Sequence, residues 1–293
     1  MRISSELIYS LCRFLPDSVF LRLRYKRYFK RPLNLSDPVT YNEKIQWLKL
    51  YDHNPEYLEL ADKCAVKQVV ADLIGQEYVV PLLGVWDHYD DIDFDRLPDQ
   101  FVLKCNHDQG SVVIVKDKAA LDHVFAKEKL EKALKRNFYY IAREWPYKTI
   151  PHKIFAEAYL EDPQGDKGLV DYKLFFFSGE CKAILVVHNR FSSSGYELTY
   201  YDPEWNRLPF TKGKDETFYP SIEKPKQLSE MLEVGTILAK KYPHVRMDFY
   251  IVNDRLYFGE YTFYPSAGFL KFNPDSWDVT FGDWIKLPPK SNG

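Results

Sequence analysis

The chain has 293 residues, 45% of them hydrophobic and 28% charged, a composition that excludes a disordered protein. Its length exceeds the size at which a single hydrophobic core usually stops growing, so we expect two or three lobes. The formal net charge of -2 gives no general reason to expect a nucleic acid as a partner.

The cysteines and the apolar segments bear on the cellular compartment. The four cysteines form no CxxC or Cys/His pattern, which argues against a zinc site and against a disulfide framework. The first residues lack a clean apolar run with a small-residue cleavage site, and no stretch is apolar and long enough to span a bilayer. These observations predict a cytoplasmic protein.

Residues 1–34 are predicted to form a basic, amphipathic helical segment. Apolar residues recur in it at helical spacing, with a break at Pro16. The basic residues after the break are Arg22, Arg24, Lys26, Arg27, Lys30 and Arg31. Through residues 1–31 the segment can contact the inner face of an anionic membrane or membrane-bound machinery. It can also dock on the body of the protein with its basic face in water, which is the interpretation we favour.

Residues 35–100 contain two predicted helices and a surface connection. Helical periodicity covers residues 41–50 and 61–74, and Gly75 closes the second helix. Short extended pieces follow between residues 78 and 86. The acidic, turn-rich run DHYDDIDFDRLPDQ then predicts a loop on the surface.

Residues 101–160 begin with a hairpin that carries a lysine and a glycine loop. The strand FVLK ends at Lys104, the loop CNHDQGS contains Gly110 and Ser111, and the strand VVIVK follows. An ammonium group beside a row of backbone N–H groups suits a polyphosphate. The loop matches neither the Walker pattern nor GxGxxG, so the signal is weak alone. A helix over residues 119–136 and a strand over residues 153–160 are predicted next.

Residues 161–293 contain two predicted strands within residues 171–188, a helix over residues 226–241 and a final hairpin. Strand alternation places Asp171 and Lys173 on one face, where the carboxylate can accept from ribose hydroxyls and the ammonium can meet a phosphate. The alternative for this pair is an ion pair of little consequence. The mixed blocks of strands and helices predict an α+β or α/β chain with largely antiparallel sheets.

The register of the final hairpin decides where its acids point. A three-residue turn at residues 253–255 would pair Val252 with Leu256 and would place Asp248 opposite Glu260. A two-residue turn would instead move Glu260 to the other face. We predict the three-residue turn.

With that register, one face of the hairpin carries four polar residues, namely Arg246, Asp248, Glu260 and Thr262. Two facing carboxylates repel each other unless a cation lies between them, and their oxygens suit Mg²⁺ or Mn²⁺. The alternative is an edge hairpin whose acids point into water. Aromatic residues around the acids argue for a ribbon covered on both sides, so the hairpin predicts a metal site.

Taken in chain order, these motifs resemble those of the TupA-like ATP-grasp family, which is found in polysaccharide-biosynthesis clusters. The resemblance extends from about residue 35 to the end of the chain. Each motif is weak singly, and their ordered occurrence is the stronger signal. The segments that carry the resemblance are TYNEKIQWLKLYD, ADKCAVKQVV, VPLLGVWD, FVLKCNHDQGS, REWPYK, AEAYL, DYKLFFFSGE, and MDFY followed by YFGEYTFYPSAGF.

The resemblance implies an ATP-grasp fold of class α+β, in which two α+β lobes with antiparallel sheets clasp ATP. Residues 1–34 would precede this fold as a helical segment, and residues 35–100 would form an N-terminal, substrate-side lobe. Residues 101–160 would form the small ATP-grasp lobe, and residues 161–293 the large lobe with the metal hairpin.

The resemblance also implies a set of site residues. Those expected to bind the nucleotide are Lys63, Lys104, Asn106, His107, Gly110, Ser111, Glu157, Tyr159, Leu160, Asp171 and Lys173. The lysines and the loop of residues 106–111 would contact the phosphates, residues 157–160 the adenine, and Asp171 the ribose. His107 can equally be a packing residue. Those expected to bind Mg²⁺ or Mn²⁺ are Asp248, Glu260 and Thr262, the last standing where many relatives have asparagine.

The implied activity is that of an ATP-dependent carboxylate–amine ligase that works through an acyl phosphate. It would attach an amino acid or amine to a uronic-acid-type sugar, small or polymeric, in the biosynthesis of a cell-surface polysaccharide. Of the residues expected to be catalytic, Arg246 would stabilise the transferring phosphoryl group or the substrate carboxylate, and Lys173 would meet a phosphate. Arg190, after an apolar strand, would bind the acidic substrate. Further substrate candidates are Arg143, Trp145, Tyr200, Tyr201, Trp205 and Arg207. The stretch around Tyr200 can also be a surface excursion held by its own aromatic residues.

Two other functions stay open. The run Asp91-Ile92-Asp93 is a DxD pattern, which a glycosyltransferase would place at a strand end, whereas here it lies in a turn-rich connection. The remaining alternative is a non-catalytic scaffold of a membrane-bound assembly machine, anchored by the basic N-terminal segment.

Overall fold

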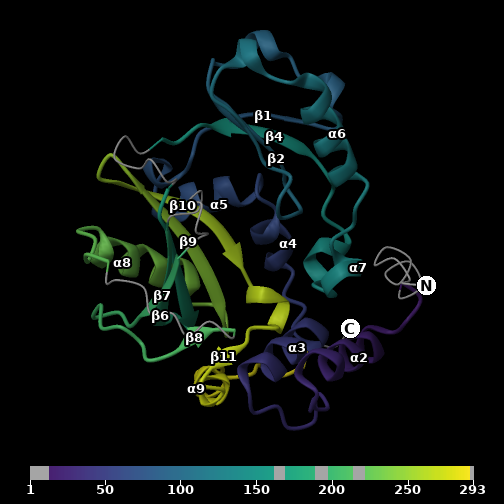
Figure 1. The fold of residues 1–293 in the computed structure, drawn as a ribbon, viewed down its shortest axis with the longest axis vertical. Coiled ribbons are helices and arrows are strands. Elements are labelled where there is room, and N and C mark those ends of the chain that lie inside the picture. The colour runs from purple at the N-terminus through teal and green to yellow at the C-terminus, as the bar shows by residue number, and fades with distance from the viewer. Residues whose placement is uncertain (1–12, 162–168, 189–196, 214–221, 291–293) are drawn as a thin grey trace.

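The computed structural model describes residues 13–161, 169–188, 197–213 and 222–290. Two antiparallel sheets, one of four strands and one of five, are packed against helices, which confirms the α+β class (Figure 1). In Figure 1 the four-stranded sheet lies at the top and the five-stranded sheet at the lower left. None of the helices in the described ranges has both the length and the apolar composition that crossing a membrane requires.

The four-stranded sheet has the order β1-β4-β2-β3, and each neighbouring pair is antiparallel. Its strands are β1 (Leu82–Trp86), β2 (Phe101–Cys105), β3 (Val113–Val115) and β4 (Ile154–Ala158). Helix α6 (His123–Leu134) packs on one face, where its Leu130 is buried with Leu103 and Ala156. Strand alternation therefore turns Lys104 and Glu157 toward the other face.

The segments between these strands are mostly short. They include η2 (Tyr89–Asp91), η3 (Phe94–Arg96), η4 (Lys118–Ala120), α7 (Tyr139–Ala142) and η5 (Trp145–Lys148). The helix predicted from residue 119 begins only at His123. The reason is that Asp122 is extended and caps α6, because its carboxylate accepts a hydrogen bond of 2.9 Å from the backbone N of Phe125.

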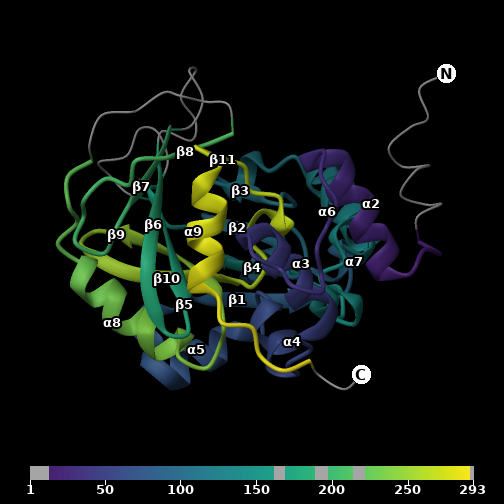
Figure 2. The ribbon, with the colours of Figure 1, turned by 90° about the horizontal axis from the view of Figure 1, so that it is seen from below.

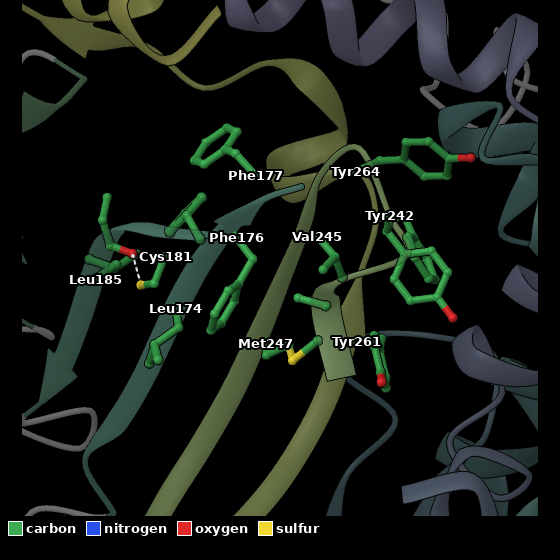
Figure 3. Close-up of a cluster of buried hydrophobic side chains, with 14 of the residues drawn as sticks. Leu174, Phe176, Phe177, Cys181, Leu185, Tyr242, Val245, Met247, Tyr261 and Tyr264 are labelled. Carbon is green, nitrogen blue, oxygen red and sulfur yellow. Dashed lines mark hydrogen bonds between the residues drawn. The ribbon is translucent and has the colours of Figure 1, made fainter. Parts of the chain in front are cut away.

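The five-stranded sheet has the order β10-β9-β5-β6-β7. Its strands are β5 (Asp171–Phe177), β6 (Glu180–His188), β7 (Glu197–Tyr201), β9 (Val245–Val252) and β10 (Arg255–Thr262). Helix α8 (Leu228–Ala239) covers one face, where a Cβ on Gly235 would lie 2.4 Å from the Phe176 ring, so the close approach requires glycine. Figure 3 shows Phe176 among the buried side chains near Val245 and Met247. The other face carries the polar residues described below.

Four helices precede the sheets in the described part of the chain, and one follows them. They are α2 (Asp17–Phe29), α3 (Tyr41–Tyr51), α4 (Glu56–Ala61), α5 (Val66–Ile74) and α9 (Ser276–Trp284). The helix predicted over residues 41–50 is confirmed, and a capping box between Thr40 and Glu43 starts it. The helix predicted over residues 61–74 is broken, because Asp62 is extended and its carboxylate accepts hydrogen bonds from the next backbone N–H groups, those of Cys64 and Ala65.

Two hydrophobic cores divide the described residues. The larger core joins helices α2 to α5 with the five-stranded sheet, α8 and α9, and the smaller core lies between the four-stranded sheet and α6. Residues 20–79 thus share a core with residues 172–285. The lobe boundaries predicted at residues 34, 100 and 160 stay a prediction, and the packing suggests a different grouping.

The hairpin of β9 and β10 corrects the predicted turn. Arg255 pairs with Val252, so the turn has the two residues Asn253 and Asp254, both with positive φ (51° and 60°). Asparagine and aspartate tolerate this conformation and favour a two-residue turn. A β-bulge between Phe258 and Glu260 then restores the pairing of Glu260 with Asp248. The predicted turn is wrong, and the predicted facing of the two acids is confirmed.

Gly259 makes this bulge possible. A Cβ at Gly259 would lie 2.7 Å from Cε2 of Tyr250 and 3.0 Å from the backbone O of Asp248. The inserted residue must therefore be glycine unless the neighbouring strand moves.

The remaining elements of the described chain are short. Beyond the hairpin lie η6 (Pro265–Gly268) and β11 (Phe272–Asn273), and β11 pairs with β8 (Thr211–Lys212). A 3₁₀ turn, η1 (Gln76–Tyr78), follows α5.

Candidate active site

The face of the five-stranded sheet opposite α8 gathers two acids around one guanidinium group. Arg246 donates to Asp248 through Nε at 2.7 Å and through Nη2 at 2.9 Å. The same Nη2 lies 3.0 Å from Glu260 Oε1 and 3.1 Å from Thr262 Oγ1. The four residues predicted to share one face therefore do so, and the cation between the two acids in this structure is Arg246.

Lys173 completes this cluster from the neighbouring strand. It pairs directly with Asp248 across β5 and β9, and its Nζ donates to Asp248 Oδ2. Its Nζ also lies 3.9 Å from Oδ1 of Asp171, a buried side chain on the same face. Burial alone would raise the pKa of Asp248, but the charges of Arg246 and Lys173 outweigh it and lower this pKa. Asp248 is therefore held ionised although it is 1% exposed.

A second ionic cluster lies on the four-stranded sheet, on the face turned away from α6. Glu157 accepts from Lys104 Nζ through Oε1 and from Lys67 Nζ through Oε2, the latter at 3.0 Å. Burial opposes ionisation of Glu157, yet the two lysine charges lower its pKa. One carboxylate thus holds two ammonium groups close together, an arrangement that suits phosphate oxygens.

Lys63 links the glycine loop to the hairpin of β9 and β10. Its Nζ donates to the backbone O of Asp108 at 2.7 Å and lies 3.9 Å from Glu260 Oε2. Its backbone N donates to the backbone O of Asn106 at 3.1 Å. The glycine loop and the hairpin acids, which are far apart in the sequence, therefore face one another across Lys63.

The side chains of the glycine loop hold the loop itself. Asn106 is fully buried, and its Nδ2 donates to Asp62 Oδ2 at 2.7 Å. Ser111 Oγ donates to Asp108 Oδ1 and accepts from the backbone N of Cys105 at 3.0 Å. Gly110 has a φ of 105°, which favours glycine. What the loop can offer a ligand is therefore mainly its backbone near Gly110.

His107 is placed for packing rather than for contact with a ligand. It is fully buried, and its ring stacks on His152 with 3.6 Å between ring centroids. Its Nε2 lies 3.1 Å from the backbone O of Arg136. Burial, and then the neighbouring His152, lower the pKa of His107, which disfavours a protonated ring. This geometry favours the packing alternative over a phosphate contact.

The remaining predicted nucleotide residues lie at strand ends. Tyr159 and Leu160 follow β4 directly and are half-buried, and the Lys116 ammonium lies 5.6 Å from the centroid of the Tyr159 ring. Asp171 opens β5. Arg190, the predicted substrate residue, lies outside the described residues.

Several substrate candidates have structural roles instead. Arg143 is 1% exposed, lies over the ring of Phe20 and has its Nε 3.1 Å from Asp17 Oδ1, so it joins α7 to α2. Tyr201 and Trp205 stack at 4.4 Å, which agrees with an excursion held by its own aromatic rings. Tyr200 differs, because it lines a cavity next to Arg246 and Lys173.

The hairpin provides an oxygen donor set that fits a divalent cation. Asp248, Glu260 and Thr262 supply two carboxylates and a hydroxyl on one face. Within the described ranges, no group of three or more His, Cys, Asp or Glu side chains is placed to bind a metal. A divalent ion here would therefore rest on two carboxylates and on oxygens of the substrate, as magnesium commonly does.

The DxD pattern runs from Asp91, the last residue of η2, to Asp93, the residue before η3. Asp91 Oδ2 accepts from the backbone N of His88 at 3.0 Å, and Asp93 Oδ1 accepts from that of Asp95 at 3.2 Å. Both carboxylates thus close 3₁₀ turns. The geometry gives this pattern no strand end.

Two cations of the site are absent from the sequence prediction. Lys67 follows Lys63 by four residues, and this spacing, typical of a helical face, was the available signal. Lys212 lines the cavity beside Arg246 from the two-residue strand β8. A strand of that length has no periodicity from which its direction could be predicted.

Comparisons with known proteins come from three directions. A family model described as TupA-like ATPgrasp matches residues 43–286. No curated protein matches the chain. Among solved structures, D-alanine–D-alanine ligase from Bacillus anthracis, complexed with ATP, is 15% identical with a TM-score of 0.44, over 78% of this chain and 65% of that one. L-amino acid ligase from Bacillus licheniformis is 12% identical with a TM-score of 0.45, over 87% of this chain and 57% of that one.

Proposed function

The chain belongs to the TupA-like ATP-grasp family, and from this premise we propose that it is an ATP-dependent carboxylate–amine ligase. The observation that carries the proposal is that Lys63 joins the glycine loop to Glu260 of the hairpin, between two ionic clusters that lie on different sheets. One cluster holds two lysines around Glu157, and the other holds Arg246 and Lys173 around Asp248 and Glu260. Cations gathered on both sheets suit the transfer of a phosphoryl group.

In this proposal the nucleotide lies between the clusters. Lys63, Lys104 and Lys67 bind its phosphates with the backbone near Gly110. The backbone of Tyr159 and Leu160 binds the adenine, whereas Glu157, which the family resemblance assigned to the adenine, holds Lys67 and Lys104 together. Asp171 binds the ribose, and Lys173 reaches a phosphate. Lys67 is an addition to the residues that the sequence suggested, supported by its ion pair with Glu157.

Magnesium fits the donor set of the hairpin. Asp248 and Glu260 would hold it, with the hydroxyl of Thr262 as a further oxygen ligand. When bound, a divalent ion neutralises charge on the transferring phosphoryl group. Arg246 and Lys173 supply positive charge from the protein to the same region. Because these two charges lower the pKa of Asp248, its carboxylate is ionised and can bind a divalent ion.

The proposed chemistry needs no protein nucleophile. An oxygen of the substrate carboxylate forms a bond to the γ-phosphorus of ATP while the bond to the β-phosphate oxygen breaks, and ADP leaves. The nitrogen of the amine then bonds to the acyl carbon, inorganic phosphate leaves, and the amine loses a proton. Arg246 and Lys173 lower the repulsion between the two anions that meet in the first step.

The substrates are proposed from the family resemblance. The acid would be a uronic-acid-type sugar of a cell-surface polysaccharide, free or within a glycan, and the other substrate an amino acid or amine. Nucleic acid is not proposed as a partner. The cavity beside Arg246, with the ring of Tyr200 in its wall, supports a substrate with a flat face.

The products test the function directly. Purified protein with Mg²⁺, ATP, D-glucuronate and an amino acid should release ADP and phosphate only when both co-substrates are present. Release of AMP and pyrophosphate would contradict the acyl phosphate route. Thermal stabilisation by a nucleotide sugar without any effect of Mg²⁺ and ATP would instead favour a glycosyltransferase.

We also propose that the protein works in the cytoplasm and contacts an anionic membrane surface through α2. Phe20, Leu21 and Tyr25 dock the helix on the body, on the side of the molecule away from α8 (Figure 2). The opposite face exposes apolar and basic residues at helical spacing, namely Val19, Leu23, Lys26, Arg27 and Lys30. Mixed apolar and positive groups on one helix face suit acidic lipid head groups.

Vesicle sedimentation tests the membrane contact. The protein should bind vesicles that contain phosphatidylglycerol and should not bind pure phosphatidylcholine. Replacing Lys26, Arg27 and Lys30 together by glutamate should abolish the difference. Equal sedimentation of this variant and the wild type would contradict the contact. The scaffold alternative makes a different prediction for cells. It would be favoured over the ligase if Asp248→Asn left polysaccharide production in cells unchanged, while the triple glutamate variant kept its ADP release in solution.

A further inference from the structure

A cavity of about 350 Å³ opens beside the ionic cluster of the five-stranded sheet, the larger of the two main sheets. One side of the cavity is the face of β5, β6 and β7 that carries Lys173. On this face, strand alternation brings apolar side chains next to Lys173. The apolar wall consists of Phe175, Leu185, Val187, Leu198 and Tyr200. Lys173, Arg246 and Lys212 also line the cavity. The cavity is at the small end of the range of ligand pockets, so it fits one ring or one amino-acid-sized group.

Of the three cations that line this cavity, Lys212 is the one whose charge is not balanced by a described carboxylate. Arg246 is paired with Asp248 and Glu260, and Lys173 is paired with Asp248. Among the described residues, Lys212 has no carboxylate within ion-pair distance, and the charges that act on it are the two cations. Desolvation first, and then Arg246 and Lys173, lower the pKa of Lys212. Lys212 is exposed where it lines the cavity, and a third cation beside two others next to an apolar wall favours the binding of an anion.

The backbone that bounds the cavity is held in place. Lys212 lies in β8, which pairs with β11, so a strand pair fixes its backbone. On the side of η6, Ser266 and Ala267 have positive φ values of 51° and 54°, which are strained for side chains other than glycine. Gln46 Nε2 donates to the backbone O of Ala267 at 3.0 Å, and Lys49 Nζ donates to the same atom at 2.6 Å. Strain that buried donors hold in place is typical of a binding site.

We propose that Lys212 binds the carboxylate of the acid substrate and that the apolar wall receives the part of the substrate next to that carboxylate. This inference rests on the proposed ligase function, which supplies the carboxylate, and it adds the residue and the pocket that select the acid. The carboxylate bound at Lys212 then lies near Lys173 and Arg246, next to the proposed position of the γ-phosphoryl group of ATP. The substrate class is a carboxylic acid with an apolar or flat face no larger than one ring.

The experiment compares Lys212→Met with the wild type in two measurements. Acid-dependent ADP release gives KM values for ATP and for the acid, and saturation-transfer NMR in the presence of Mg²⁺ and ADP gives acid binding without turnover. The probe acids are D-glucuronate, D-galacturonate and cyclohexanecarboxylate. Loss of a charged hydrogen bond should raise the KM for the acid by about 10-fold or more, with the KM for ATP unchanged. Lys212→Arg should restore part of the affinity, because it keeps the charge.

Lys271→Met is the matched control. Lys271 is exposed beside the same strand pair, does not line the cavity and should behave as the wild type. Wild-type acid binding by Lys212→Met, or a raised KM for ATP instead of the acid, would overturn the inference. Failure of the wild type to bind any of the three acids would overturn the assignment of the pocket. Release of AMP by the wild type contradicts the acyl phosphate route, whereas the NMR comparison still decides the role of Lys212.

Discussion

The two sheets carry ionic clusters of different balance. The four-stranded sheet holds one carboxylate, Glu157, between Lys104 and Lys67, whereas the five-stranded sheet holds two carboxylates that share Arg246 and Lys173. The first cluster has positive charge in excess, which suits phosphates. The second is balanced, and the buried Asp171 beside Lys173 adds a further negative charge, which suits a divalent cation. Under the proposed function, the difference predicts that nucleotide affinity depends mainly on the four-stranded, smaller sheet and phosphoryl transfer mainly on the five-stranded, larger sheet.

The largest effect is expected from Asp248→Asn in the large-sheet cluster. The change removes a proposed metal ligand and leaves Arg246 and Lys173 with less compensation. ADP release should fall by about 10²- to 10³-fold or more, with a smaller effect on ATP binding. The free energy of unfolding should fall by up to about 3 kcal/mol, because a buried ion pair loses one partner. Coupled enzyme assays and urea unfolding measure the two effects.

Asp254→Asn is the control for that change. Asp254 lies in the turn of the same hairpin, is exposed and has a positive φ that asparagine tolerates. Its activity and stability should match the wild type. If Asp248→Asn kept most of its activity, the large sheet would not be the phosphoryl-transfer side.

The next effect concerns the register that brings the large-sheet acids together. Gly259→Ala places a Cβ 2.7 Å from Cε2 of Tyr250, so the bulge must shift. We expect a loss of about 1–3 kcal/mol in the free energy of unfolding, together with lower activity as Glu260 turns away from Asp248. The double variant with Tyr250→Ala removes part of the obstacle and should recover part of the loss. An alanine variant with wild-type activity and stability would show that the bulge does not set the register.

The large-sheet cluster could be predicted from the sequence because strand alternation fixes which side chains share a face. Strand alternation predicts one face for Arg246, Asp248 and Glu260, although the predicted turn is one residue too long. The error cancelled, because a bulge at Gly259 supplies the extra residue. A bulge depends on the fit between neighbouring strands, here the contact of Gly259 with Tyr250, and this fit has no signature in a single hairpin sequence.

The small-sheet cluster was only half predictable. Lys104 and Glu157 lie on strands, and both were assigned to the nucleotide site. Lys67 was missed because it reaches Glu157 from a helix whose start depends on the break at Asp62. His107 shows the opposite limit, because its place in a polar loop suggested a ligand contact, whereas tertiary packing buries it against His152.

A smaller effect is expected from the lysines of the small-sheet cluster. Lys67→Met and Lys104→Met should each raise the KM for ATP by about 10-fold, because each removes one charged contact to a phosphate, while kcat changes little. Lys132→Met is the matched control, since Lys132 is exposed on α6. A fall in kcat at unchanged KM would place these lysines on the phosphoryl-transfer side and would remove the distinction between the two sheets.

The smallest effect separates the clusters by pH. In the folded protein Lys104 and Lys67 lower the pKa of Glu157 below its ordinary value of 4.5, against the effect of burial. Below that value the unfolded chain binds a proton that the folded chain resists, so the stabilising contribution is present above about pH 4.5 and is lost as the pH falls through the folded pKa. Glu157→Gln lacks this titration and should lose less unfolding free energy between pH 6 and about pH 3, as measured by urea unfolding. Glu161→Gln, which changes an exposed acid just beyond β4, should keep the wild-type slope. Equal slopes for Glu157→Gln and the wild type would mean that the two lysines do not hold Glu157 ionised, and the small-sheet cluster would then lack the fixed anion that keeps its ammonium groups together.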